Sequence, residues 1–148
     1  MKTMTKIVFR LEQDESGYPP SGSEAVWAVE LKNGHYKVEN IPFYIRGISS
    51  GDEIAVDRSE DGLYFRELIN PSGNSTFRLL LTHPEFAEDV RRDLLTLGCV
   101  TECHKRMGLL AVEIPPSVQI QPFLDYIVNA QACDQIDIEE GALRHVIE

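Results

Sequence analysis

Apolar and polar residues alternate in short runs over the first half of the chain, which is the pattern of half-buried β-strands. A polar loop at 12–23 follows the first run. Asn33-Gly34 lies between two later runs and favours a type I′ hairpin turn, in which both residues have positive φ. Short strands at this spacing predict a small, strongly bent sheet or barrel. The expected strands are 6–11, 25–31, 35–38, 42–45, 53–56 and 63–68.

The period of the pattern changes after the sequence Asn-Pro-Ser-Gly-Asn at 70–74. An apolar strand is expected at 76–81, and apolar residues then recur at helical spacing from Pro84 until Gly98 ends the helix. Strands at 99–105 and 109–114, joined by a turn at 106–108, come next. A second helix follows Pro115-Pro116, and a short strand is expected at 136–138. The predicted inner face of the second helix is Ile120, Phe123, Leu124, Ile127 and Val128.

The order strand, helix, strand, strand, helix, strand in the second half predicts a ferredoxin-like βαββαβ unit, with two helices over one face of a four-stranded antiparallel sheet. We therefore expect an α+β fold in two parts. Residues 1–72 are predicted to form a mainly β subdomain, and residues 73–148 a ferredoxin-like α+β subdomain.

The composition is that of an ordinary globular protein, with 43% hydrophobic and 26% charged residues. The first apolar run is too short for a signal-peptide core, and no run approaches the length of a membrane-spanning helix. A cytoplasmic location is therefore expected.

The net charge of −10 narrows the choice of partner. The longest basic clusters are Arg91-Arg92 and Lys105-Arg106. Nucleic acids and anionic membranes are disfavoured as partners, because both are bound through concentrated positive charge. A basic protein partner is favoured instead.

Cys99, Cys103 and Cys133 are too few and too scattered for a disulfide framework, so reduced thiols are expected. Cys99, Cys103 and His104 form the best candidate metal group. On an extended strand, however, the two cysteines would lie about 13 Å apart, with His104 on the opposite face. That separation is too large for one zinc ion or one disulfide. No metal and no cofactor are predicted.

None of the four histidines belongs to a local catalytic motif such as H-E-x-x-H, and the sequence contains no P-loop. A catalytic group assembled only by folding stays open, but we expect no catalytic residue. Aromatic residues of the first half are expected in the core of the barrel, with an aromatic ligand cage as the alternative. They are Trp27, Tyr36, Phe43, Tyr44 and Tyr64.

Several short segments between Ile7 and Gly141 resemble a bacterial family known only as domain-of-unknown-function family number 4265. They are Val-Trp-Ala at 26–28, Gly-His-Tyr-Lys-Val-Glu-Asn-Ile-Pro-Phe at 34–43, Gly-Asp at 51–52, Asn-Ser-Thr-Phe-Arg at 74–78, Leu-Gly-Cys at 97–99 and Leu-Ala-Val-Glu-Ile-Pro at 110–115. The resemblance implies a compact bacterial cytoplasmic protein and assigns no catalytic residue.

Two groups of acidic residues carry the functional hypothesis. Runs of charge are usually solvated faces, but an acidic surface can also bring a basic partner quickly to its binding site. We therefore expect a protein-binding module, in its sharpest form an immunity protein that neutralises a bacterial toxin. The alternative is a regulatory domain that senses a small ligand. The predicted partner-binding residues are Asp52, Glu53, Asp57, Asp134, Asp137, Glu139 and Glu140.

Overall fold

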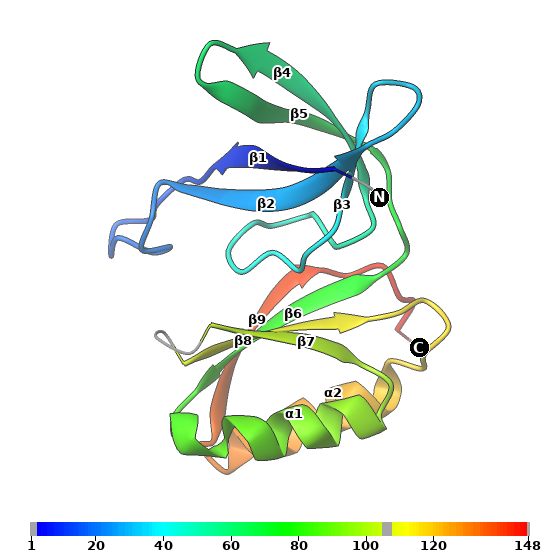
Figure 1. Ribbon diagram of the computed structural model, residues 1–148. Helices are drawn as coiled ribbons and strands as arrows, with labels where there is room; N and C mark the ends of the chain where they lie inside the picture. The colour runs from blue at the N-terminus through cyan, green and yellow to red at the C-terminus, as the bar shows by residue number, and fades with distance from the viewer. Residues whose placement is uncertain (1–2, 105–107, 148) are drawn as a thin grey trace. The chain divides into compact units, whose positions relative to one another are not determined.

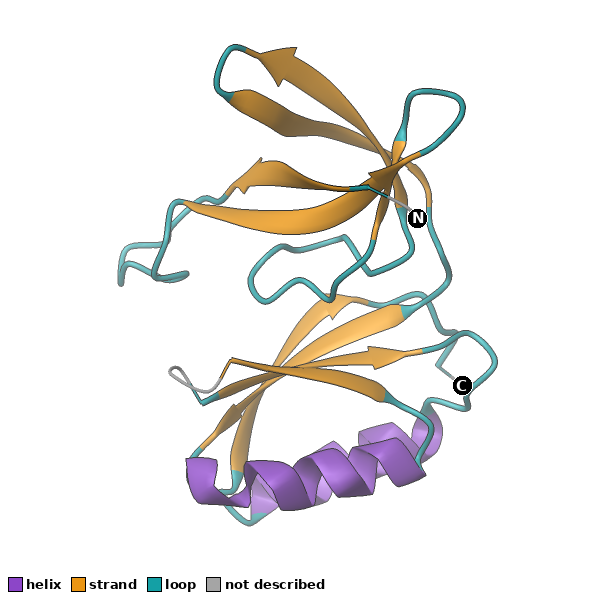
Figure 2. Cartoon of the chain, viewed as in Figure 1, coloured by secondary structure: helices purple, strands orange, loops and turns teal. Residues whose placement is uncertain are grey.

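The structure, a computed structural model, describes residues 3–104 and 108–147 (Figure 1). The chain divides into two compact units, Met1–Ser72 and Gly73–Glu148. Over the described residues the fold is mixed α+β and consists mostly of strands, with five strands closed into a barrel in the first unit and two helices in the second (Figure 2).

The barrel of the first unit is built from β1 (Met4–Arg10), β2 (Ser23–Glu30), β3 (Tyr36–Val38), β4 (Glu53–Ser59) and β5 (Gly62–Asn70). Successive strands pair antiparallel, and β1 also pairs in parallel with β5, which closes the barrel. Burial alternates along β1 and β3, as a period of two requires. The buried core comprises Ile7, Phe9, Val26, Ala28, Tyr36, Val38, Ile45, Ile48 and Ile54.

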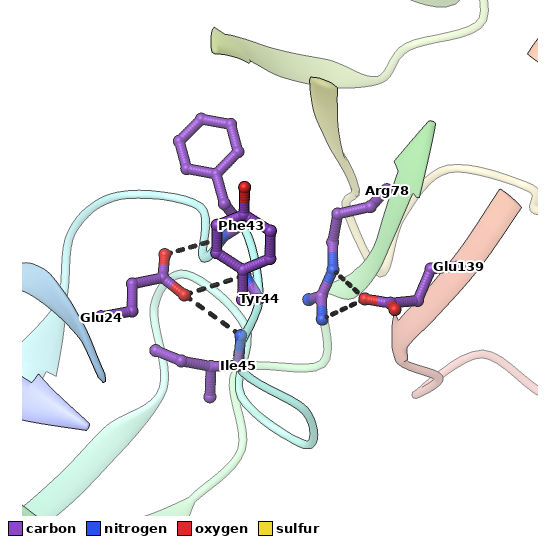
Figure 3. A network of polar contacts seen from close by, with 6 residues as sticks. All are labelled: Glu24, Phe43, Tyr44, Ile45, Arg78 and Glu139. Atoms are coloured by element: carbon purple, nitrogen blue, oxygen red, sulfur yellow. Dashed lines mark hydrogen bonds and ion pairs between the residues drawn. The ribbon is translucent and has the colours of Figure 1, made fainter. Parts of the chain in front are cut away.

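The strand expected at 42–45 is wrong, because these residues lie in the loop between β3 and β4. The Glu24 carboxylate accepts hydrogen bonds from the backbone N–H groups of Phe43, Tyr44 and Ile45 at 2.7, 2.8 and 3.1 Å (Figure 3). A strand would have used these groups for pairing with its neighbour. The side chain therefore replaces a strand ladder as their partner.

The turn between β2 and β3 also differs from the expected type I′ turn. Gly34 has a φ of 86°, but among the described residues other than glycine positive φ occurs only at Asp134. The Gly34 N–H donates to the Leu31 carbonyl, and the Leu31 N–H donates to the His35 carbonyl. The loop thus has three residues, with a left-handed glycine at its end. The Asn33 side chain accepts the His35 N–H at 3.0 Å and stabilises this longer loop.

Most of the aromatic residues expected in the barrel core lie outside it. Tyr36 is buried, but Trp27 is 45% exposed and Tyr64 is half-buried. Trp27 alternates with buried Val26 and Ala28 on β2, so its side chain must face outward. Phe43 and Tyr44 are half-buried in the loop. Aliphatic side chains therefore fill most of the barrel.

The second unit contains β6 (Ser75–Leu81), the 3-10 turn η1 (Pro84–Phe86), α1 (Ala87–Thr96), β7 (Val100–His104), β8 (Leu109–Ile114), α2 (Gln121–Ala132) and β9 (Ile136–Ala142). The strands form an antiparallel sheet in the order β7-β8-β6-β9, with β7 and β9 at its edges. Both helices cover the same face of the sheet (Figure 1). Lys105 and the first two residues of the expected turn at 106–108 lie outside the described residues.

The inner face of α2 was predicted correctly at Phe123 and Ile127, which are buried against the sheet. It was wrong at Val128, which is 60% exposed. The buried stripe continues from Ile127 to Ala130 three residues later, and this places Val128 on the other side of the helix.

Candidate functional site

The seven acidic residues predicted to bind a partner are divided between the two units, with Asp52, Glu53 and Asp57 in the first. Asp52 is completely buried. Its Oδ2 accepts the Ser49 N–H at 2.9 Å, and its Oδ1 accepts the Ser72 N–H at 2.8 Å. The carboxylate thus ties the loop before β4 to the segment after β5. Asp52 therefore stabilises the barrel and is not accessible to a partner, although the prediction required it to be.

Glu53 is held by three side chains. Asn70 donates to its Oε1 at 2.9 Å, Asn33 donates to its Oε2 at 2.9 Å, and His35 Nδ1 lies 2.6 Å from Oε2. These hydrogen bonds, that of Asn70 first, lower the pKa of the Glu53 carboxyl to about 2. Glu53 therefore fastens the β2–β3 loop to the barrel.

Asp57 is exposed on β4, where its Oδ1 lies 3.7 Å from Arg66 Nη1. An exposed ion pair of this length contributes little to stability. Asp57 is therefore accessible, but it stands apart from the other two acids of its unit in both burial and bonding.

The acids of the second unit lie on or beside the edge strand β9. Asp134 has a φ of 57° in the turn after α2, and Asp137 and Glu140 belong to β9. All three side chains are exposed. Within the described part of the chain, none of these three carboxylates forms an ion pair. They place uncompensated negative charge along an open sheet edge.

Glu139 differs from its neighbours on β9, because it binds the buried side chain of Arg78 across the β6–β9 pair (Figure 3). Arg78 Nε and Nη2 donate to Glu139 Oε1 at 3.0 and 2.8 Å. A β-carbon at Gly141 would lie 2.2 Å from Arg78 Nη1, so a larger residue there would displace the guanidinium. A buried guanidinium requires a carboxylate partner. The Arg78–Glu139 ion pair therefore links β6 to β9 and stabilises the sheet.

Folding also assembles a serine–histidine pair that the sequence gives no local signal for. Ser75 Oγ lies 2.6 Å from His145 Nδ1 and accepts the backbone N–H groups of Arg144 and His145. With two bonds accepted, the hydroxyl donates its own proton to Nδ1. Nε2 then donates to the carbonyls of Pro115 and Val118, at 2.9 and 3.1 Å. Ser75 is completely buried, and the pair holds residues 144–145 against the start of β6 and the segment after β8.

The cysteines are spread over different environments, with Cys99 buried, Cys103 half-buried and Cys133 exposed. Burial raises the pKa of the Cys99 thiol to about 11. The described residues contain no cluster of three or more His, Cys, Asp or Glu side chains suited to a metal ion. No helix in the described residues has the length and apolar character to span a membrane.

Comparison with known proteins supports the fold and the family. The chain is similar to the crystal structure of a hypothetical protein from Neisseria gonorrhoeae, with a TM-score of 0.80 and 19% sequence identity over 99% of this chain and 98% of the other. At this identity the similarity concerns the fold alone. No curated protein matches the chain. Residues 24–137 match the family described as "Domain of unknown function (DUF4265)", as the sequence resemblance predicted, and the chain belongs to this family.

Proposed function

We propose that this protein is a non-catalytic protein-binding module and that it engages a basic partner through the acidic edge of its second unit. The proposed surface, here called the β9 acidic edge, consists of Asp134, Asp137 and Glu140. A cytoplasmic location accompanies this proposal. Asp52, Glu53 and Glu139 are not part of it, since their carboxylates serve hydrogen bonds within the fold.

The proposed scaffold of the surface is a ferredoxin-like domain. The sheet order β9-β6-β8-β7, the antiparallel pairing and the placement of α1 and α2 on one face support this assignment. Such a sheet leaves its last strand at an edge, where one row of backbone groups faces away from the sheet.

The observation that carries the proposal is that the edge strand and the turn before it carry exposed carboxylates, which form no ion pair with any residue that the structure describes. An edge strand can accept an additional strand through main-chain hydrogen bonds, and flanking side chains then give specificity. Acidic side chains on an edge strand repel the same edge of another copy, which prevents aggregation, and they attract a basic segment. In its sharpest form the proposal is an immunity protein, whose acidic edge covers a basic site of a bacterial toxin.

The test combines protection with binding. The chain is co-expressed with the product of the neighbouring gene, and cell growth and the dissociation constant of the pair are measured. Reversing Asp134, Asp137 and Glu140 to Lys is expected to abolish protection and weaken binding by about 30-fold or more, the size of a hot-spot effect. The association rate should also fall steeply with added salt.

A control with the same change in charge is available in the same unit. Glu85, Glu88 and Asp125 are exposed, and they belong to η1, α1 and α2 rather than to β9. Their reversal to Lys is expected to change the dissociation constant by less than about threefold. If the two triple variants weakened binding equally, the effect would come from the net charge of the protein and not from the β9 acidic edge. Protection and binding that survive reversal of the β9 acidic edge would refute it, and Asp57→Lys then tests the remaining accessible acid.

A further inference from the structure

A groove opens on the first unit beside the end of β1. It has a volume of about 600 Å³, and every residue that lines it belongs to the first unit. One bank is formed by residues 10–19 and the other by residues 44–48. The volume lies within the range of ligand sites, about 300–1,000 Å³. The apolar floor and walls comprise Phe9, Leu11, Ile45, Ile48, Phe65 and Leu68.

Four aromatic side chains line the groove. Phe9 and Phe65 stack with their centroids 4.5 Å apart, and Tyr18 meets Tyr44 edge to face at 6.0 Å. The two tyrosines come from opposite banks. Tyr18 is 39% exposed, and Pro19 lines the groove next to it. These two ring pairs give the groove an aromatic lining.

Both banks are fixed by carboxylates of the chain itself. Glu24 binds three consecutive N–H groups of the bank that contains Tyr44 (Figure 3). On the other bank, Asp14 Oδ1 accepts the N–H groups of Ser16 and Tyr18 at 2.9 and 3.0 Å. Bonds to a charged acceptor order both loops before any ligand arrives. The groove is therefore preorganised, which lowers the entropic cost of binding.

The charge of the groove is uneven. Glu12 and Asp14 lie on the bank at 10–19, and Arg46 lies on the other. Arg10 belongs to the acidic bank, but its guanidinium stacks on the Tyr64 ring at 4.5 Å and its charge acts on Asp61. The Glu12 side of the groove therefore favours a positively charged group.

We propose that this groove binds a proline-rich segment in the polyproline II conformation, with an arginine or lysine facing Glu12 and Asp14. Aromatic-lined grooves bind such segments because proline rings pack on aromatic side chains, and the stiff helix loses little entropy on docking. The acidic bank supplies charge complementarity for the basic residue. The site is in the first unit and does not depend on the β9 acidic edge.

The experiment uses the full chain and an array of proline-rich peptides, each with one or two arginines. Fluorescence polarisation is expected to find saturable binders. For the tightest binder, Tyr18→Ala and Tyr44→Ala should each weaken binding about tenfold or more. Replacing its arginines with glutamate should have a similar effect, and Glu12→Lys should remove the preference for arginine. Because Tyr18 is 39% exposed and lies outside the buried core of the barrel, the Tyr18→Ala variant is expected to fold.

Two substitutions on the same unit serve as matched controls. Trp27→Ala removes an exposed aromatic side chain, and Glu60→Lys reverses an exposed acid, both outside the groove. They should leave the peptide affinity within about twofold, as should the reversal of the β9 acidic edge. The proposal is overturned if no peptide binds, if the tyrosine variants bind normally, or if arginine and glutamate peptides bind equally. A small molecule that co-purifies with the chain and is released by Tyr44→Ala would overturn it as well.

Discussion

Glu24, Asp52, Glu53 and Glu139 each accept hydrogen bonds from donors far away in the sequence. Arg78 and Glu139, for example, are 61 residues apart. The sequence shows seven acids in two groups, and nothing in their spacing separates the bound carboxylates from the accessible ones. Arg78 alone has a signal in the sequence, because an arginine between Phe77 and three leucines is expected to be buried and to need a charged partner. The partners of Glu24 had no such signal.

The burial of Asp52 predicts a cost to stability that a surface acid would not show. Asp52→Asn replaces a charged acceptor of two backbone N–H groups with an amide whose NH₂ must face one of those donors. We expect the free energy of unfolding in urea to fall by about 2–3 kcal/mol. Asp57→Asn, on the exposed part of the adjacent strand, should change it by less than about 0.5 kcal/mol. Equal effects would mean that Asp52 is not held as described.

The low pKa of Glu53 predicts a specific pH dependence. Its folded pKa of about 2 lies below the ordinary value of 4.5, so ionised Glu53 favours the folded state. This contribution is present above pH 4.5 and is lost as the pH falls toward 2. Glu53→Gln should therefore flatten the decline of the unfolding free energy between these pH values, measured by urea titration at several pH values. Glu60→Gln, at an exposed turn, should keep the wild-type slope; the same slope in Glu53→Gln would contradict the prediction.

Gly141 predicts a steric effect at the Arg78–Glu139 pair. In Gly141→Ala, the new methyl group would overlap the guanidinium and approach the Thr76 carbonyl oxygen at 3.2 Å. Arg78 is buried and bound, so moving it disturbs the ion pair. We expect a loss of about 1–3 kcal/mol in unfolding free energy, the usual cost of overpacking. Gly22→Ala, with no atom within 4 Å of the added carbon, is the control and should be nearly neutral.

At the scale of elements, strict alternation and helical spacing were sufficient wherever hydrophobic burial alone decides the structure. They predicted both helices and the strands that form the two cores. They failed at 42–45, where the Glu24 side chain takes the backbone N–H groups, and at Asn33-Gly34, where a side-chain bond lengthens the loop. A pattern of apolar residues contains no information about such side-chain-to-backbone bonds.

The two sides of α2 predict opposite responses to truncation. Phe123 is completely buried and contacts Phe77 with ring centroids 5.1 Å apart, whereas Val128 is exposed. Phe123→Ala should lower the unfolding free energy by about 3–5 kcal/mol through lost burial and a cavity. Val128→Ala should lie within about 0.5 kcal/mol of the wild type. Thermal and urea unfolding followed by circular dichroism measure the unfolding free energy of both variants. A large loss in Val128→Ala would mean that Val128 packs on the inner face of α2.

At the scale of the whole molecule, each unit has a core of its own. Among the described residues, the buried cluster of the barrel and that of the helix-covered sheet share no residue. We therefore predict separate responses to core truncation. Ile54→Ala should lower amide-exchange protection mainly in β1 to β5, and Leu110→Ala mainly in β6 to β9, with each variant losing about 2–5 kcal/mol locally. Hydrogen-exchange mass spectrometry distinguishes this from a single cooperative unit, in which either substitution would lower protection equally throughout the chain.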